Sequence, residues 1–467
     1  MTISRRQFIR SGVVLTAGFG GLKTFANTPH GSRFGPGNEV PGFGKLVQDP
    51  KGVINLPEGF SYKIISKTGD VMTDGLLVPG AHDGMGAFEG PDGSTILVRN
   101  HEINPKSSKL SPFGLRGEKM TRKISGQLYD DAHGSHICYG GTTTLVYDTN
   151  KQKLLSHHLS LSGTLRNCAG GVTPWHTWVT CEETTTRSNK QFALDHGYAF
   201  EVAAATRPEL QKAKPLKAMG RFNREAVAVD EKSGVVYQTE DRGDGLIYRF
   251  IPKVPGKLHE GGKVQALGIK GDPSVDTRNW PDQERSFPES KPMEVEWIDL
   301  EDIDAPEDDL RLRGFKDGAA RFARGEGIWA GKGEVYWACT NGGKSRLGQI
   351  FKYTPSIAEG TAAEDKAPGE LELFVESEDA ELLGACDNLT IAPWGDLVVS
   401  EDSGKNSSIV GVTTEGKCYR IAQVAFDSEL AGICFSPDAS TMFVNAQWNP
   451  GQTLAITGPW DRLKMRN

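Results

Sequence analysis

The sequence has few of the features that anchor or cross-link a protein. Its seven cysteines include no CxxC pair, so neither a zinc ribbon nor a thioredoxin-type motif is supported. Because seven is an odd number, at least one thiol stays unpaired. The apolar run from Gly12 to Leu22 is too short to span a bilayer, and no GxSxG motif marks a nucleophile elbow. We therefore expect no stable membrane anchor and no nucleophile elbow of the α/β-hydrolase type.

Sustained helical periodicity and positive charge are also scarce. The 56 glycines and 25 prolines, with only 37% hydrophobic residues, are typical of many short strands and turns. The formal net charge of −7 excludes a nucleic-acid partner held by neutralisation of its phosphates. An anionic substrate would have to meet a local cation, and bound metal is one source of that charge.

The N-terminus carries an export signal. Arg5 and Arg6 stand directly before the apolar run, and a small residue, Ala26, follows it. This order is typical of a twin-arginine signal peptide rather than of a short amphipathic helix. We expect residues 1–26 to be removed, the twin-arginine translocase to be a transient partner, and the mature protein to be periplasmic or secreted. That route carries folded proteins, which suits a metal inserted before export.

One hairpin pattern recurs along the chain. The clearest copies are EAVAVDEKSGVVYQTED from Glu225, EGIWAGKGEVYWACTN from Glu326 and DNLTIAPWGDLVVSED from Asp387. NCAGGVTPWHTWVTCEE fits the same frame, and two weaker copies are GMGAFEGPDGSTILVRNHE and AGICFSPDASTMFVNAQ. About six copies predict an all-β fold, a six-bladed β-propeller. We expect a single domain over residues 27–467, with a long insertion around residues 252–321 that contains an added strand at MEVEWIDL.

The repeat places acids and one cysteine at matching positions. In a hairpin, the start of the first strand and the end of the second lie at the same edge, so these residues should ring one mouth of the central channel. The first positions are Cys168, Glu225, Glu326 and Asp387, and the second strands end in Glu182/Glu183, Glu240/Asp241 and Glu401/Asp402. Converging carboxylates repel one another unless protons or cations neutralise them. The pattern predicts bound metal; the alternative is that each acid separately accepts hydrogen bonds from backbone amides.

These motifs resemble a known family. The twin-arginine signal, NCAGGVTPWHTWVTCEE, GRFNREAVAVD, TEDRGDGLIYRF, FARGEGIW and LAGICFSPDASTMFVNAQWNPG are together similar to the PhoX-type alkaline phosphatases. The resemblance implies an exported propeller enzyme that hydrolyses phosphate monoesters with ferric iron, Fe(III), and calcium, Ca. It also implies that a cysteine thiolate binds iron. By motif, the family's cysteine corresponds to Cys168, and its glutamates to Glu225 and Glu326.

The neighbours of these residues depart from the family pattern. His176 interrupts the family's TPWGT, Arg224-Glu225-Ala226 stands for its His-Glu-Gly, and Arg324-Gly325-Glu326-Gly327 stands for its RPEW. Arg324, two residues before a ring acid, is positioned to hold phosphate oxygens in a bidentate manner; the alternative is a salt bridge at the blade edge. Arg324 is therefore our candidate catalytic and substrate-binding residue.

Two other functions remain open from the sequence. A calcium-dependent propeller hydrolase of lactones or phosphotriesters would hold calcium alone in the acid ring and make Cys168 incidental. A non-catalytic binding propeller would hold no transition metal tightly. Stoichiometric iron separates the first of these from a phosphomonoesterase with an alkaline optimum. We expect the active species to be a monomer.

Overall fold

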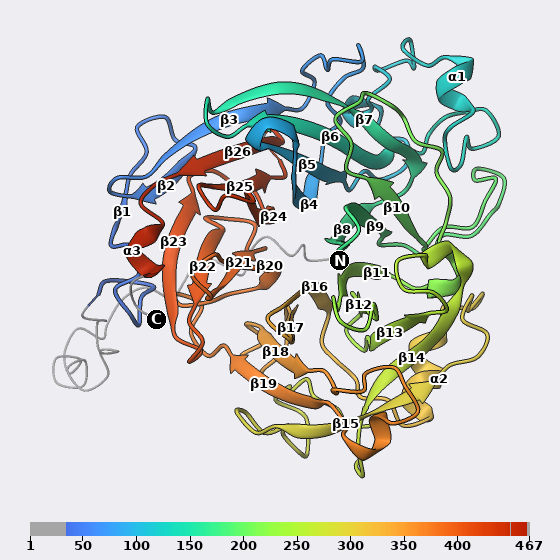
Figure 1. The fold of residues 1–467 in the computed structure, drawn as a ribbon, viewed down its shortest axis with the longest axis vertical. Helices are drawn as coiled ribbons and strands as arrows, with labels where there is room; N and C mark the ends of the chain where they lie inside the picture. The colour runs from blue at the N-terminus through green and yellow to red at the C-terminus, as the bar shows by residue number, and fades with distance from the viewer. Residues whose placement is uncertain (1–33, 449, 465–467) are drawn as a thin grey trace, which may run out of the picture.

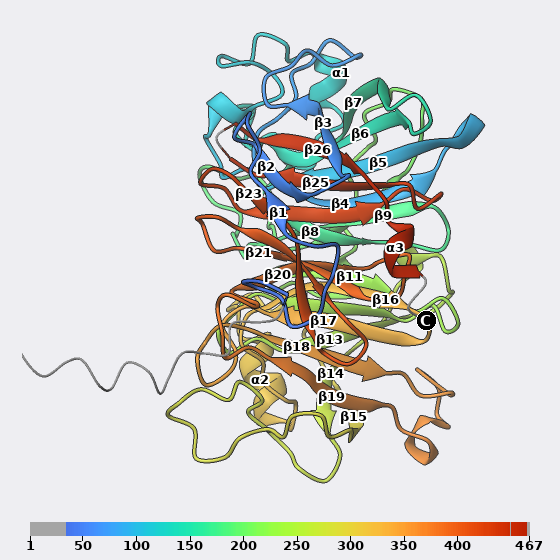
Figure 2. The same cartoon turned by 90° about the vertical axis from the view of Figure 1, so that its left-hand side faces the viewer.

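The computed structural model describes residues 34–448 and 450–464, so the predicted signal peptide lies outside the described residues. Antiparallel sheets follow one another around a central axis (Figure 1), and their strands run between the two faces of the disc (Figure 2). The predicted all-β propeller is confirmed. Within the described residues, no helix is long and apolar enough to cross a membrane.

The sheets are built from consecutive strands. The first two sheets contain β4 (His82–Glu89), β5 (Ser94–His101), β6 (Gly140–Asp148) and β7 (Lys153–Thr164), then β8 (Asn167–Val172), β9 (Thr177–Glu182) and β10 (Ala199–Ala203). The next two sets are β11 (Arg224–Val229), β12 (Val236–Glu240), β13 (Ile247–Pro252) and β14 (Gly262–Ile269), then β16 (Gly325–Gly331), β17 (Glu334–Cys339), β18 (Gln349–Thr354) and β19 (Glu370–Glu376). The last two sets begin with β20 (Cys386–Ile391), β21 (Leu397–Glu401), β22 (Ser408–Val412) and β23 (Cys418–Val424), then β24 (Leu430–Phe435), β25 (Thr441–Ala446) and β26 (Gln452–Thr457).

The first strand of each set lies innermost. In the described part of the chain, β4, β8, β11, β16, β20 and β24 each contact the next in this order, and β24 contacts β4 again. The six hairpins found in the sequence supply these six strands. The inner strands therefore form a closed ring around the axis.

Strands from the N-terminal side complete the ring. β3 (Ser61–Lys67) pairs with β26 and becomes the outer strand of the C-terminal sheet. β1 (Leu46–Val47) pairs with β2 (Ile54–Pro57), which extends the neighbouring sheet along β23. Both ends of the described chain are thus held in sheets that lie side by side.

The predicted insertion is shorter than expected. β14 is the fourth strand of its set, so the insertion proper begins after Ile269. It contains β15 (Met293–Asp299), the strand predicted at MEVEWIDL, and α2 (Leu310–Lys316). β15 pairs with both β14 and β19 and joins two neighbouring sets into one nine-stranded sheet.

Helical segments are few and short in the described residues. The α-helices besides α2 are α1 (Arg122–Ser125) and α3 (Asp461–Lys464). Short 3₁₀ helices are η1 (Pro91–Gly93), η2 (Ser108–Leu110), η3 (Lys217–Met219), η4 (Leu258–Glu260) and η5 (Glu364–Lys366).

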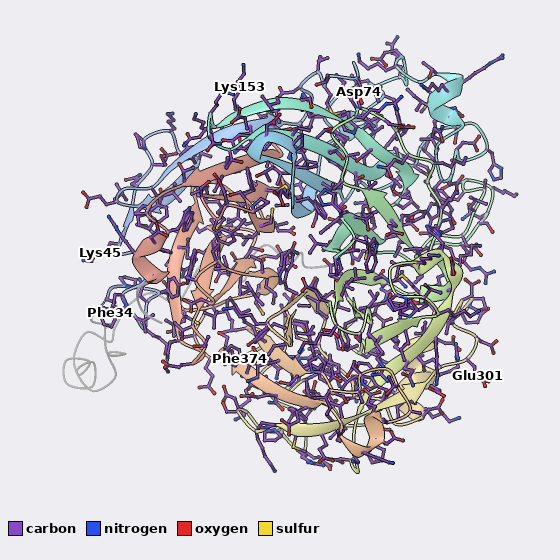
Figure 3. All side chains as sticks on the ribbon, in the orientation of Figure 1. Phe34, Lys45, Asp74, Lys153, Glu301 and Phe374 are labelled. Carbon is purple, nitrogen blue, oxygen red and sulfur yellow. The ribbon has the colours of Figure 1, made fainter. Side chains whose placement is uncertain are left out.

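The core lies between neighbouring sheets. Side chains fill the space between them, whereas charged residues such as Lys153 and Glu301 project at the rim (Figure 3). Between the last two sheets, Trp394 stacks on Trp460 with ring centroids 5.5 Å apart, and Phe43 packs edge-on against both rings. Such pairs contribute beyond the apolar area they bury. They hold adjacent sheets at fixed angles around the axis.

Each inner strand is irregular at the same place. The pairing with the second strand shifts after the first residues of β4, β8, β11, β16, β20 and β24. A bulge of this kind redirects the side chains it contains. The second residue of five of these strands is an acid or Cys168, so the bulges aim these side chains together.

Small residues close the channel beneath this level. A Cβ atom on Gly84 would lie 2.6 Å from the Cα of Ala169, and one on Gly327 would lie 2.7 Å from the Cα of Asn388. These contacts are too short for any side chain, so glycine permits the inner strands to approach. The cavity left on the axis holds only about 20 Å³. The channel is therefore closed below this mouth and does not form a continuous pore along the axis.

Candidate metal centre

Carboxylates and one thiol converge at one mouth of the channel. Three overlapping groups have ligand atoms that all lie within 4.8 Å of one another: Asp83, Glu102 and Cys168; Cys168, Glu183 and Glu225; Glu225, Glu326 and Asp387. Cys168 and Glu225 each belong to two groups. The three groups therefore form one continuous cluster, which we call the channel cluster.

The predicted first-position residues all belong to the channel cluster. Cys168, Glu225, Glu326 and Asp387 are the second residues of β8, β11, β16 and β20, within the bulges described above. The residue before the strand has a positive φ at Arg166, Arg324 and Ala385. The same local backbone thus precedes Cys168, Glu326 and Asp387, whereas Asn223, before the strand of Glu225, does not have a positive φ.

The predicted acid pairs divide into two kinds. Glu183, Asp241 and Asp402, the second acid of each pair, follow the strand and face the cluster: Asp241 and Asp402 act electrostatically on Glu326 and Asp387, respectively. The first acid of each pair lies within a sheet instead. Glu182 accepts hydrogen bonds from the backbone of Leu165 and Gly197, Glu240 from that of Leu246, and Glu401 from that of Gly384 and Ser408. For Glu182 and Glu401, the alternative of separate backbone hydrogen bonding describes the geometry. Glu240 accepts hydrogen bonds from Leu246 and Tyr248 through Oε2, whereas its buried Oε1 has no partner among the described residues.

Three acids at the mouth are not among the residues predicted from the repeat. Asp83 occupies the second position of β4, one residue before the predicted copy of the repeat begins at Gly84. Glu102 ends the same hairpin and lies in the first group. Glu429, directly before β24, interacts electrostatically with Asp83 and Asp387. The signal for the first two was present in the repeat; Glu429 lies outside its frame.

Burial and mutual repulsion raise the pKa values of these acids. Burial is the largest cause for Glu225, whose pKa lies well above its usual value, and repulsion by Glu326 and Glu183 adds to it. The pKa of Asp387 rises to about 7 through burial and the neighbouring Asp402. The pKa of Glu183 also rises to about 7, through burial, although Arg166 opposes the shift. Protons or cations must neutralise such a cluster.

Glu225 shows that the protein's own donors do not satisfy the cluster. Its side chain is fully buried, and neither carboxylate oxygen has a hydrogen-bond partner among the described residues. A buried carboxylate without partners is costly. Both oxygens are therefore available to cations, and hard cations prefer oxygen ligands of this type.

Two arginines stand at the rim of the cluster. Arg166 Nη2 pairs with Glu102 Oε1 at 2.7 Å and with Glu183. Arg324 donates from Nε and Nη2 to the two oxygens of Asp241 at 2.7 and 2.9 Å, and its Nη2 lies 2.8 Å from Glu326 Oε1. Its side chain is 35% exposed, and its Nη1 makes no hydrogen bond within the described residues. Arg324 is thus oriented by Asp241 and keeps one donor group for a ligand.

Cys168 differs from the other cysteines by its surroundings. All seven cysteines are free thiols, and Cys168 alone among them is only partly buried as a residue. Burial of its sulfur and repulsion by Asp83 and Glu225 raise its pKa well above the usual value. A thiolate here requires a compensating cation.

A second group of metal-ligand types lies away from the channel. Asp130, Cys138 and His196 also have ligand atoms within 4.8 Å of one another, and all three residues are buried. His196 lies between Glu182 Oε1 at 2.6 Å and Asp130 Oδ2 at 3.2 Å. Burial lowers the pKa of His196, but Glu182 and the hydrogen bond to Asp130 outweigh it and raise it to about 12. We call Asp130, Cys138 and His196, with the neighbouring Glu182, the blade cluster. Its cation is the protonated imidazole of His196.

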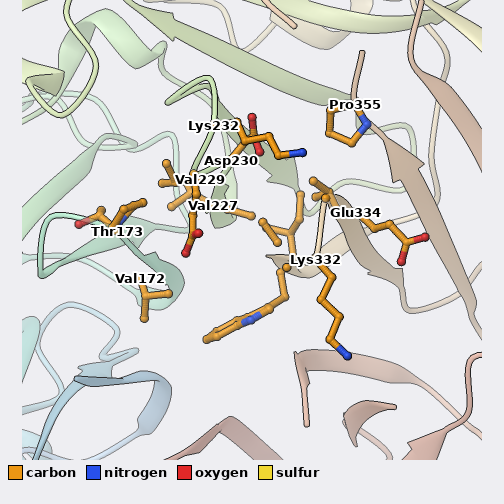
Figure 4. Close-up of a pocket in the computed structure, with 18 residues that line it drawn as sticks. Val172, Thr173, Val227, Val229, Asp230, Lys232, Lys332, Glu334 and Pro355 are labelled. Atoms are coloured by element: carbon orange, nitrogen blue, oxygen red, sulfur yellow. The ribbon is translucent and has the colours of Figure 1, made fainter. Parts of the chain in front are cut away.

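The opposite mouth of the channel has a different character. A cavity of about 320 Å³ lies there between the hairpin turns, lined among others by Val172, Val227, Lys232 and Lys332 (Figure 4). It is separated from the channel cluster by the length of the inner strands and contains no member of that cluster. The metal binding predicted from the sequence is therefore assigned to the mouth that holds the channel cluster.

Comparison with known proteins places the chain. A family model described as alkaline phosphatase PhoX matches residues 41–451. The chain belongs to this family. The resemblance seen in the motifs is confirmed, and it makes the protein a metal-dependent phosphatase by family. No curated protein matches the chain in sequence.

One solved structure agrees with the fold of this PhoX-family chain. This is PhoX from Pseudomonas fluorescens in complex with vanadate, a transition state analogue; it is 18% identical, the match covers 87% of this chain and 96% of that one, and the TM-score is 0.64. A gluconolactonase from Xanthomonas campestris matches with 10% identity over 89% of this chain and 100% of its own, at a TM-score of 0.39. Only the first of these likenesses is close enough to support the fold.

Proposed function

We propose that the protein hydrolyses phosphate monoesters at the channel cluster, using iron and calcium. The observation that carries this proposal is Glu225, a fully buried carboxylate that has no donor among the described residues and lies at the centre of acids that share its site. Family membership supports the reaction, and the donor set supports the metals. Carboxylate oxygens suit ferric iron and calcium, whereas a thiolate among them favours a transition metal over calcium alone.

The proposed ligands come from both strands of the hairpins. They are Cys168, Glu225, Glu326, Asp387, Glu183, Asp241 and Asp402, together with Asp83 and Glu102, which the structure adds. Glu182, Glu240 and Glu401 are left out because each accepts a hydrogen bond from a backbone amide and none belongs to the three groups of the channel cluster. Bound iron and calcium would supply positive charge to the phosphoryl oxygens and a nucleophilic water at neutral pH.

The protein's own side chains would orient the substrate. Arg324, held by Asp241, presents Nη1 at the rim and would donate to phosphoryl oxygens as they gain negative charge. Thr340 donates its hydroxyl hydrogen bond to Glu326 Oε1 at 2.8 Å and fixes that carboxylate. The narrow channel below excludes bulk water from the inner side of the site. Substrate would enter and leave from one face.

Hydrolysis of p-nitrophenyl phosphate by purified protein tests the proposal. We expect activity with an alkaline optimum, loss of activity on chelation, and recovery with iron plus calcium. Arg324→Ala should lower kcat/KM by about a hundredfold, mainly through KM, because a charged donor to phosphate is lost, while the metal content stays near that of the wild type. Turnover of a lactone or phosphotriester but not of this ester would support the calcium hydrolase instead.

Export by the twin-arginine route, with a periplasmic or secreted monomer as product, is also part of the proposal. It rests on Arg5 and Arg6 before the apolar run. Replacing both with lysine should retain the protein in the cytoplasm, as fractionation would show. Unchanged delivery would exclude this route, and a dimer in sedimentation would exclude the monomer.

A further inference from the structure

A polar cavity opens directly beside the channel cluster. It has a volume of about 410 Å³ and is lined by Arg166, Asn223, Arg242 and residues 183–186. Glu183 belongs both to this cavity and to the channel cluster. If the cluster holds the phosphoryl group, as proposed above, the remainder of the substrate extends into this cavity.

One side of the cavity is fixed by hydrogen bonds. Asn223 Nδ2 donates to Glu183 Oε1 and to the backbone carbonyl of Asp241, both at 3.0 Å. Arg166 Nε donates to the backbone carbonyl of Glu183 at 3.0 Å, and its guanidinium pairs with Glu102 and Glu183. The charge of Arg166 is therefore already matched by acids of the cluster.

Arg242, on the other side, is matched much less well. Its Nη2 pairs with Asp308 Oδ2 at 3.1 Å, and the two side chains are 34% and 31% exposed. Ion pairs this exposed contribute little to stability. Its Nε is buried and has no hydrogen-bond partner among the described residues. Asp308 has a second cationic neighbour, because Arg311 Nη1 lies 3.4 Å from its Oδ1.

These contacts make Arg242 a receptor for an anion. Nε and Nη2 lie on the same edge of a guanidinium, and a carboxylate or phosphate binds that edge through two parallel hydrogen bonds. Asp308 occupies this edge and does not line the cavity, so an anion in the cavity gains the edge only when Asp308 turns toward Arg311, its second cationic neighbour. The anion would then satisfy the Nε donor, which is buried and unpartnered among the described residues.

We propose that this cavity is a subsite for a second anionic group on the leaving group of the substrate. The preferred substrates are phosphate monoesters of alcohols that also carry a carboxylate or a second phosphate. Water cleaves the ester P–O bond, inorganic phosphate leaves, and the alcohol product takes up a proton and retains its second anion. This inference rests on the proposed phosphomonoesterase activity.

Two substrates of nearly equal size test the subsite: glycerol 3-phosphate and 3-phosphoglycerate, which replaces a CH₂OH group with a carboxylate. We expect the wild type to prefer 3-phosphoglycerate in kcat/KM. Arg242→Gln should lower the preference ratio about tenfold, mainly through KM, because it removes the bidentate contact. Propane-1,3-diol bisphosphate, compared with its monophosphate, shows whether a second phosphate serves as well as a carboxylate.

Arg313→Gln is the matched control. Arg313 pairs with Asp309 at 3.0 Å with side chains 33% and 34% exposed, close to the values for Arg242 and Asp308, and it does not line the cavity. Its preference ratio should equal that of the wild type. Equal ratios in the wild type and both variants, with p-nitrophenyl phosphate still hydrolysed, would overturn the subsite alone. Absence of hydrolysis of every phosphate ester by wild-type protein would overturn the proposed function together with the subsite.

Discussion

The channel cluster and the blade cluster are made of similar residues and differ in how their charge is compensated. Each combines one cysteine with carboxylates in a buried setting. In the blade cluster, His196 lies between Asp130 and Glu182, and backbone amides of Ala132, Leu194 and Gly197 complete their hydrogen bonds. In the channel cluster, Glu225 has no donor at all among the described residues.

The difference distinguishes a structural ion network from the proposed metal site. Closeness of ligand atoms is common to both clusters, so it does not distinguish them. A protonated imidazole can compensate two carboxylates, and backbone amides strengthen the arrangement. A carboxylate such as Glu225, which meets acids and a thiol but no donor among the described residues, needs a cation from outside the chain. Satisfaction of hydrogen bonds is therefore the more informative observation, and three experiments can break or sharpen the comparison.

The largest expected effect is that of Cys168→Ser compared with Cys138→Ser. A thiolate bound to ferric iron gives a charge-transfer band in the visible, so the protein should be coloured. Cys168→Ser should remove that band, lower the iron content and abolish activity, because a hydroxyl is a poor substitute for a thiolate. Cys138→Ser should keep the band and the iron.

Cys181→Ser provides a packing control for this comparison, since Cys181 is fully buried among apolar side chains. Absorbance and elemental analysis of the three variants decide the matter. Colour and iron retained in Cys168→Ser would show that the site is built from carboxylates alone. Loss of iron in Cys138→Ser would mean that the blade cluster binds metal.

The next largest effect separates two adjacent acids. Glu182→Gln should lower the free energy of unfolding by about 3 kcal/mol, because it removes a partner from the buried His196 pair. Metal content per folded protein should remain. Glu183→Gln should lower the metal content and change the unfolding free energy less in the presence of a chelator.

Chemical denaturation with and without chelator, combined with elemental analysis, measures both quantities. The opposite outcome, in which Glu182→Gln loses metal and Glu183→Gln does not, would contradict the placement of these two acids. Similar effects of both substitutions would remove the distinction between the two clusters.

The smallest expected effect is that the stability of the metal-free protein depends on pH. The pKa of Asp387 is raised from 3.8 to about 7 and that of Glu183 from 4.5 to about 7, so their protonated forms favour the folded state. This stabilisation is present below about pH 4 and is lost as pH rises through about 7. The thermal midpoint of chelated protein should fall by several degrees between these values.

Metal-loaded protein should show little of this decline, because cations compensate the ionised acids. Scanning calorimetry at several pH values, with and without chelator, compares the two forms. A chelated protein that becomes more stable as pH rises through this window would contradict the assigned direction of the pKa shifts.

The sequence predicted the hairpin repeat and most of the channel cluster, but not the direction of individual side chains. Matching positions in the repeat were enough for Cys168, Glu225, Glu326 and Asp387, since related hairpins place related residues alike. In Glu182-Glu183, which acid faces the axis depends on where strand pairing ends. Two adjacent identical residues contain no signal for that.

Other residues of the site could be identified only from the folded structure. Asp83 lies one residue before the predicted copy of the repeat, and the bulge in β4 obscures its matching position in the sequence. Glu429 reaches the cluster from a loop position, and Arg242 lines the neighbouring cavity only because β9 and β12 belong to adjacent sheets. Contacts between distant segments of this kind leave no pattern in a single sequence.

Because β3 pairs with β26, the fold can be completed only at the end of synthesis. β3 leaves the ribosome early, but its partner is among the last strands to be made. Asp83 on β4 and Glu429, directly before β24, come together only when these two inner strands meet and close the ring. A chain truncated before β26 should not form the complete metal site. Metal binding would therefore indicate that synthesis has reached the last strand.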